Sequence, residues 1–92
     1  MKSEETLSEE WAARGFSCGL WTDPPGQCWE NYVHDSDELV VVCEGEIEFE
    51  MNGQKQILKP GQEMFIPAGV YHSVRNVGGT VAQWYYGYKR VA

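Results

Sequence analysis

The stretch Tyr32-Val33-His34-Asp35-Ser36-Asp37-Glu38 contains one of the two histidines of this chain, and the other is His72. Asp35-Ser36-Asp37 has the composition of a tight turn, so we expect His34 and Glu38 to lie beside each other on neighbouring strands. If a β-barrel directs His72 to the same point, two imidazoles and one carboxylate converge. Such a ligand set suits a divalent metal, so the stretch predicts a metal site in an all-β fold.

Short extended runs separated by glycine and proline turns continue from this stretch in both directions. The expected strands cover residues 16–21, 27–34, 38–43, 46–51, 54–59, 63–67, 70–76 and 81–91. Residues 46–51 alternate carboxylates with apolar side chains, and Asn52-Gly53 is typical of a type I′ hairpin turn. Residues 39–43 are apolar on both faces, as in a central strand. This pattern predicts an antiparallel sandwich or barrel.

The N-terminal segment differs from the rest of the chain. Residues 1–10 are acidic and polar, and we expect them to be flexible or to form one short helix. Thr6 and Glu9 have the spacing of a capping box, which predicts a brief helix that continues to Arg14. Because no linker or repeat divides the remainder, residues 11–92 are expected to form a single domain.

Composition restricts the partners and the location. The net charge is −7, which argues against binding to nucleic acid or to anionic membranes, since both require a basic surface. We see no apolar run long enough to span a bilayer and no secretory signal. The odd number of cysteines does not indicate a disulfide scaffold. We therefore expect a cytoplasmic protein with reduced thiols.

The aromatic content is high for 92 residues, with four Trp and five Tyr. A domain of this size buries a thin core, so part of this aromatic surface is expected to lie in a subunit interface. Trp29 falls at an odd position of its strand, on the face expected to point outward. We therefore predict a homodimer.

Two gapped motifs resemble those of the cupin family. The first family motif reads G-x5-H-x-H-x(3,4)-E-x6-G, and the matching positions here are Gly26, Tyr32, His34, Glu38 and Gly45. Tyr32 stands where the family has its first histidine, and every other landmark fits.

The second motif follows after fifteen residues, the short spacing of small single-domain cupins. It reads G-x5-P-x-G-x2-H-x3-N and is matched by Gly61, Pro67, Gly69, His72 and Asn76. The resemblance covers residues 26–76, which is more than half of the chain.

The resemblance implies a double-stranded β-helix, a jelly-roll-like barrel with a pocket in its mouth. In cupins, three histidines and a glutamate usually hold one divalent ion such as Fe, Mn, Ni or Zn. Carried over by position, the implied metal ligands are His34, Glu38 and His72, with Tyr32 as a departure.

Three outcomes remain open for Tyr32. It could be a fourth ligand, although a phenol must be deprotonated by the metal before it binds. It could instead place its hydroxyl near the metal without binding it, or in contact with a substrate. There the hydroxyl could act as a proton donor or acceptor. The third outcome is a site without metal.

The two-residue period of a strand places Cys28, Glu30, Tyr32 and His34 on one inward face. Glu30 is thereby a candidate substrate contact in the pocket wall, or a solvated residue at its rim. Cys28 is expected in the core. Trp84, Tyr86 and Tyr88 share a face of the last strand, where we expect core or dimer contacts, with ligand stacking as the alternative.

The function predicted from these features is that of a metal-dependent cupin enzyme, of oxygenase or isomerase type, acting on a small polar metabolite. Two alternatives stay open: a binding or sensor module without turnover, and a structural cupin without metal. Fold alone does not select among them.

Overall fold

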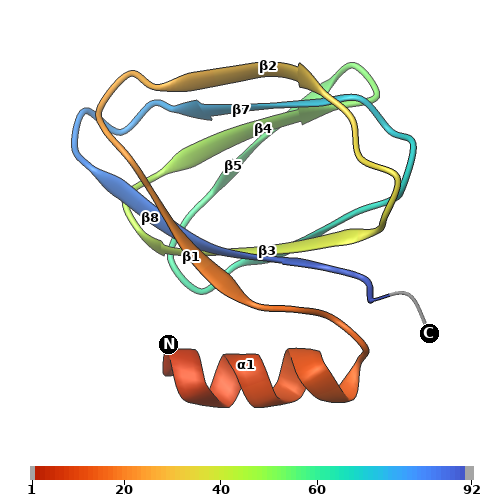
Figure 1. Cartoon of the computed structure of the whole chain (residues 1–92). Helices are drawn as coiled ribbons and strands as arrows, with labels where there is room; N and C mark the ends of the chain where they lie inside the picture. The colour runs from red at the N-terminus through yellow and green to blue at the C-terminus, as the bar shows by residue number, and fades with distance from the viewer. Residues whose placement is uncertain (1, 91–92) are drawn as a thin grey trace.

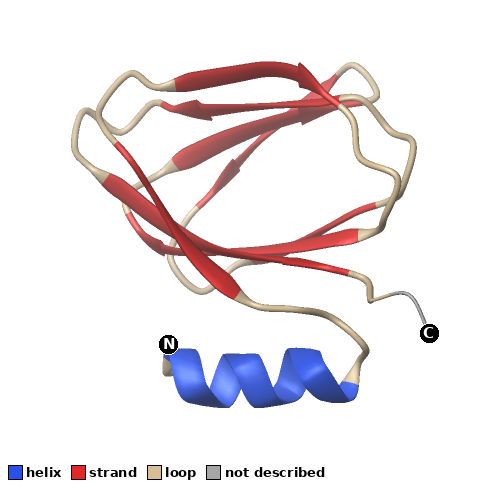
Figure 2. Ribbon diagram, in the orientation of Figure 1, coloured by secondary structure: helices blue, strands red, loops and turns tan. Residues whose placement is uncertain are grey.

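A computed structural model describes residues 2–90, which form one helix and eight strands (Figures 1 and 2). The elements are α1 (Glu4–Ala13), β1 (Gly19–Asp23), β2 (Cys28–Tyr32), β3 (Glu38–Glu44), β4 (Ile47–Met51), β5 (Gln54–Leu58), β6 (Glu63–Ile66), β7 (His72–Asn76) and β8 (Ala82–Tyr88). The predicted all-β fold with a short N-terminal helix is confirmed. Residue 1 of the expected N-terminal segment, residue 91 of the last expected strand and residue 92 of the expected domain lie outside the described range.

The strands form two antiparallel sheets that face each other. One has the order β2-β7-β4-β5 and is the upper layer in Figure 1; the other has the order β1-β8-β3-β6 and is the lower layer. Apart from the hairpin β4-β5, strands that neighbour each other in a sheet are distant in sequence, as in β1-β8 and β2-β7. This topology brings residues from both ends of the chain to one pocket.

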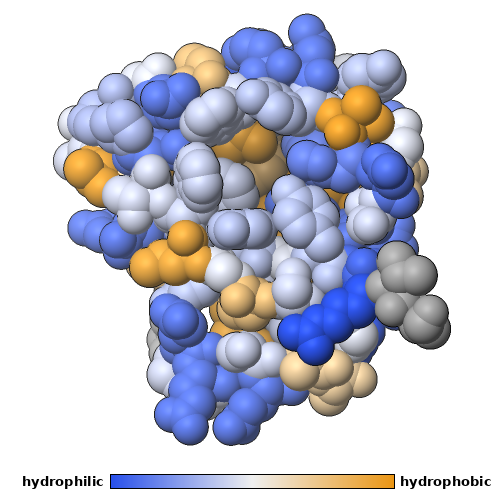
Figure 3. Space-filling model, viewed as in Figure 1, coloured by the Kyte–Doolittle hydropathy of each residue, from blue (hydrophilic) through white to orange (hydrophobic). Residues whose placement is uncertain are grey.

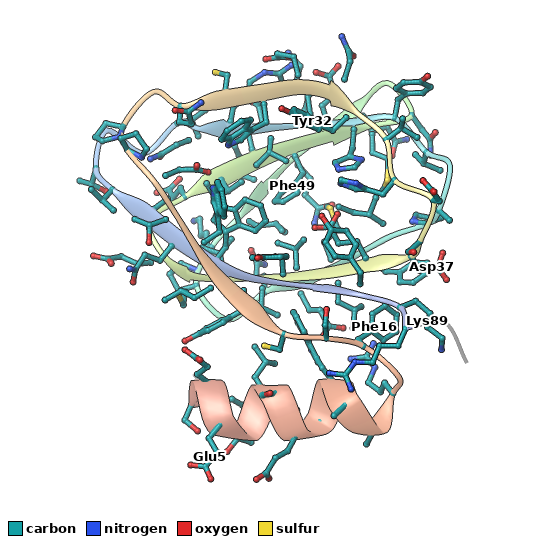
Figure 4. The ribbon with its side chains drawn as sticks, viewed as in Figure 1. Glu5, Phe16, Tyr32, Asp37, Phe49 and Lys89 are labelled. Carbon is teal, nitrogen blue, oxygen red and sulfur yellow. The ribbon has the colours of Figure 1, made fainter. Side chains whose placement is uncertain are left out.

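The core between the sheets follows from the alternation of apolar residues. Ile47 and Phe49 of β4 are buried against Val40 and Val42 of β3, with Trp84 of β8 beside them. Figure 4 shows Phe49 between the two sheets. The predicted inward direction of the apolar residues in 46–51 is confirmed.

A second core lies on the opposite face of the lower sheet. Leu39 and Val41 of β3 point away from the first core and pack against Leu7 and Trp11 of α1, together with Phe16. The prediction that this strand is apolar on both faces is therefore confirmed, because each face serves a different core.

The helix begins one turn earlier than the predicted capping box. Ser3 is the N-cap, and its hydroxyl accepts a hydrogen bond from the backbone N–H of Thr6. The assignment of the cap to Thr6 is wrong, since Thr6 already lies in the first turn. Arg14, which follows the helix, forms an ion pair with Glu63 of β6 and ties the helix to the sheet.

The close approach of the chain to β8 requires a glycine. A Cβ atom at Gly87 would lie 2.0 Å from the carbonyl oxygen of Ser17 and 2.8 Å from the ring of Trp11. The absence of a side chain at residue 87 thus lets the helix and the segment after it pack directly on the sheet.

Polar residues dominate the face shown in Figure 3, where the outer side of α1 is hydrophilic and apolar residues form separate patches. Within residues 2–90, no helix combines the length and the apolar character needed to cross a membrane.

Candidate metal centre and aromatic pocket

The structure brings His34, Glu38 and His72 together at one end of the space between the sheets. The Nε2 atoms of His34 and His72 lie 3.5 Å and 3.8 Å from Oε1 of Glu38. One potential ligand atom from each residue lies within 4.8 Å of the others. The spacing of the two motifs therefore identified three residues that converge.

His34 and Glu38 converge by a different route from the one expected. His34 lies in the link between β2 and β3, and these strands belong to opposite sheets, so the predicted pairing of neighbouring strands is wrong. The link is held from outside: the N–H of Gly69 donates to the carbonyl of His34, and the N–H of Ala68 donates to Asp37 Oδ1. The turn of the second motif thus fixes the position of His34, a candidate metal ligand from the first motif.

The tautomer of His72 follows from its backbone contact. Nδ1 lies 3.2 Å from the carbonyl oxygen of Val70, and a carbonyl can only accept, so Nδ1 carries the proton. In the neutral ring, the lone pair of Nε2 then faces Glu38, where it is available to a metal.

Glu38 is the electrostatically costly member of this group. It is 4% exposed, and its Oε1 is buried with no hydrogen-bond partner among residues 2–90. Burial raises the pKa of the Glu38 carboxyl to about 7, and burial also lowers the pKa of His34, assisted by the proximity of His72. An ionised carboxylate buried without partners is stabilised by a nearby cation, and two imidazole nitrogens lie beside this one, so these residues fit a divalent metal.

The predicted face of β2 is wrong for Cys28, Glu30 and Trp29. The register shifts by one residue between Trp29, which pairs with Val74, and Tyr32, which pairs with His72, and Asn31 has a φ of 55°. The extra residue reverses the alternation within the strand. Trp29 therefore lines the pocket, and Cys28 is exposed.

Glu30 lies on the outer face of the sheet as a consequence of this bulge. Its two carboxylate oxygens accept hydrogen bonds of 2.8 Å from Nε and Nη2 of Arg75, which also binds Glu48 and Glu50. This places Glu30 in an ion-pair cluster outside the pocket, where the expected contact with a substrate is not supported.

The pocket beside His34, Glu38 and His72 is a cavity of about 320 Å³ with a largely aromatic wall. The rings that line it come from Trp21, Trp29, Tyr32, Phe49, Trp84, Tyr86 and Tyr88. Neighbouring rings meet edge to face with centroids about 6 Å apart, the arrangement that ring quadrupoles favour. The face shared by residues 84, 86 and 88 thus lines the pocket, and Trp84 also packs in the core.

Asp23 fixes part of this wall and was not identified from the sequence. Its side chain is buried and accepts hydrogen bonds from three indole N–H groups, those of Trp21 at 2.8 Å, Trp29 at 3.1 Å and Trp84 at 3.1 Å. One carboxylate thereby holds three of the pocket's rings in place. Because the three tryptophans lie on β1, β2 and β8, no local sequence signal connects them.

The two tyrosines nearest the ligand group differ in position. Tyr32 is 43% exposed at the pocket wall, and its ring packs against that of Trp29 (Figure 4). The hydroxyl of Tyr88 lies 3.4 Å from Nε2 of His34, and burial raises the pKa of Tyr88 to about 12. Sequence reasoning missed Tyr88 as a neighbour of the site because its only signal was the aromatic alternation of residues 84–88.

Comparison with known proteins gives a family match over most of the chain. Residues 19–88 match the family model described as "Cupin domain". A curated relative from Streptomyces cyaneus, "Polyketide synthase CurC", is 36% identical over 73 residues, which is 78% of this chain and 47% of that protein. This chain thus spans about half the length of that relative.

Two solved structures illustrate the likeness of fold. The Cupin_2 domain of an XRE family transcriptional regulator from Enterobacter cloacae gives a TM-score of 0.76 at 24% identity and covers 89% of this chain and 90% of its own. An oxalate oxidase in complex with the substrate analogue glycolate gives a TM-score of 0.74 at 24% identity, covering 83% of this chain and 42% of its own. At these identities the likeness shows the fold alone.

Proposed function

This chain belongs to the cupin family, and from that premise we propose that it is a metal-dependent enzyme of oxygenase or isomerase type. His34, Glu38 and His72 would hold one divalent ion. The observation that carries the proposal is the buried Oε1 of Glu38, which faces two imidazole nitrogens within 3.8 Å. A divalent ion bound there would supply a Lewis acid for a substrate oxygen, with coordination positions left open.

The chain's own residues orient one donor and surround the site with apolar carbon. The carbonyl of Val70 holds His72 in one tautomer, and aromatic rings make up most of the remaining pocket wall. Beside an apolar wall the effective dielectric constant is lower than in water, so electrostatic interactions with a substrate are stronger. These features favour a site that positions and polarises one oxygen atom of a bound molecule.

The wall changes the class of substrate that we propose. The sequence predicted a small polar metabolite, whereas the cavity presents aromatic carbon on most of its surface. A flat, carbon-rich molecule with one oxygen directed toward Glu38 matches this lining better. The relative named as a polyketide synthase supports a substrate of this kind, since polyketides are carbon-rich and bear oxygen at regular positions.

A binding or sensor module without turnover is the second candidate. It is favoured by Tyr32, which stands at the position of one of the family's usual metal-binding histidines and leaves two histidines where the family uses three. Both candidates require metal and ligand to bind, so turnover of a bound ring compound distinguishes them.

A structural cupin without metal is the third candidate, and metal content alone separates it from the other two.

The central test is the metal content of the purified protein after reconstitution with Fe, Mn, Ni or Zn and removal of excess ion. We expect about one equivalent of at least one of these metals in the wild type, and a large loss in His72→Ala. Glu46→Gln is the matched control, because Glu46 is an exposed carboxylate on the outer face and its loss should leave binding unchanged. Negligible metal in the wild type under all four conditions would refute the proposal.

A further inference from the structure

Tyr88 is built into the lower sheet directly opposite the metal-ligand carboxylate. In the antiparallel pair β3-β8, Tyr88 is the register partner of Glu38, so both side chains point to the same face. Its backbone N–H donates to the hydroxyl of Ser17, which anchors the strand at this residue. The position of the phenol is therefore set by the sheet and not by a mobile loop.

The ring of Tyr88 places its hydroxyl oxygen next to the donor atoms of the candidate metal centre. Its centroid lies 5.0 Å from that of His34, edge to face, and its Oη lies 3.4 Å from Nε2 of His34. That nitrogen is itself 3.5 Å from Oε1 of Glu38. The phenol oxygen thus extends the group of converging donors by a fourth atom.

These separations have the size of a coordination shell. Donors bound about 2.0–2.2 Å from one ion lie roughly 3–3.5 Å from each other in a tetrahedral or octahedral arrangement. The 3.4 Å and 3.5 Å separations at His34 agree with this range, and the 3.8 Å separation from His72 to Glu38 exceeds it slightly.

Tyr32, at the position of the family's first histidine, is placed differently. It lies on β2 as the register partner of His72, but its ring turns toward Trp29 and remains 43% exposed. Within residues 2–90, the structure gives its hydroxyl no hydrogen bond to His34, Glu38 or His72. The motif position and the phenol nearest the ligands are therefore two different residues.

We propose that Tyr88, and not Tyr32, supplies the fourth protein ligand of the metal centre. The assignment rests on the proposed metal site and deepens it. When the ion binds, the O–H bond of Tyr88 breaks, the proton passes to solvent and the phenolate oxygen donates its electron pair to the ion. No oxidant or reductant is involved in this step.

The test uses Fe(III) as the probe, because a coordinated phenolate gives an intense visible charge-transfer band and an uncoordinated phenol does not. Wild type, Tyr88→Phe, Tyr32→Phe and Tyr85→Phe are loaded with Fe(III), and bound iron is measured in each sample. Tyr85 is the matched control, since it lies on the same strand but packs on the α1 side of the sheet. Far-ultraviolet circular dichroism and thermal unfolding establish that each variant is folded.

We expect the band in the wild type, in Tyr32→Phe and in Tyr85→Phe, and its loss in Tyr88→Phe while the protein remains folded. Iron bound at one equivalent without a band would overturn the assignment, as would loss of the band in Tyr32→Phe alone. If the wild type binds no iron or other metal, the proposed metal centre itself fails and the assignment falls with it.

Tyr88→His covers the case in which Tyr88→Phe does not fold. Imidazole keeps both a ring and a donor atom at residue 88, so iron should bind at near one equivalent with no phenolate band. Retention of the full band in this variant would show that another tyrosine coordinates the ion.

Discussion

Replacing Glu38 by glutamine should stabilise the metal-free protein, although it removes a proposed metal ligand. The side chain is 5% exposed, and burial raises its pKa to about 7 from a reference value of 4.5. The folded state therefore holds this proton more tightly than the unfolded state. As the pH rises from about 4.5 to 7, the unfolded chain ionises first and stability falls; above pH 7 it stays constant.

The magnitude follows from the two pKa values. Each pH unit of difference is worth about 1.4 kcal/mol, so ionised Glu38 costs the fold about 3 kcal/mol above pH 7. Glutamine carries no charge and lacks this cost. We expect the free energy of unfolding of metal-free Glu38→Gln to exceed that of the wild type by about 3 kcal/mol at pH 8. This corresponds to a rise in melting temperature on the order of 10 °C. At pH 5 the difference should fall below about 1 kcal/mol.

The groups that face Glu38 are His34, His72 and Tyr88, and all three are present in both proteins. Urea unfolding at pH 5, 6, 7 and 8 with a chelator present measures that difference. Glu46→Gln, at an exposed carboxylate, should show no such trend.

The reasoning would be refuted by a difference between Glu38→Gln and the wild type that does not grow with pH, because Glu38 would then carry no buried charge. Addition of the bound metal supplies an internal check. The ion should stabilise the wild type by binding the folded state and should have a smaller effect on the variant, which reverses their order.

The remaining predictions concern the residues around the site and the assembly. Asp23→Ala should lower the free energy of unfolding by about 2–4 kcal/mol, with Asp23→Asn milder, because three indole N–H groups lose their acceptor; urea unfolding measures both. Gly87→Ala should cost at least about 2 kcal/mol or prevent folding, since the new Cβ meets the carbonyl of Ser17 at 2.0 Å, and expression yield with thermal unfolding tests it. Arg75→Gln should lower the melting temperature at low ionic strength and lower it less at high salt, because three carboxylates lose their shared cation; thermal unfolding at both salt levels tests this. Light scattering at micromolar concentration should give a homodimer, and a monomer would contradict that prediction.

The convergence of His34, Glu38 and His72 could be predicted from the sequence because these residues occupy the expected positions of two gapped family motifs. The inward face of residues 46–51 could be read as well, since an uninterrupted strand keeps a two-residue period. The faces to which the side chains of Trp29 and Glu30 point could not be predicted from this period. They depend on the bulge at Asn31, whose N–H donates to the hydroxyl of Ser73 on the neighbouring strand.

The roles of Tyr88 and Asp23 could not be predicted from the sequence for a second reason. Tyr88 reaches the site because β8 pairs with β3, and the two paired residues are fifty positions apart in sequence. Asp23 matters because β1, β2 and β8 bring three indoles to one carboxylate. Composition and periodicity describe each strand separately, whereas these contacts arise from the pairing order of the sheets.

The two-sided character of β3 links the stability of this small domain to its pocket. A chain of 92 residues has little apolar surface to bury, and here part of the inner space is given to a cavity and to the costly Glu38. Leu39 and Val41 add buried apolar surface on the outer face of the sheet, where α1 packs against them. The helix thus supplies a second core outside the barrel, while the inner face of the same strand begins with Glu38, the proposed metal ligand.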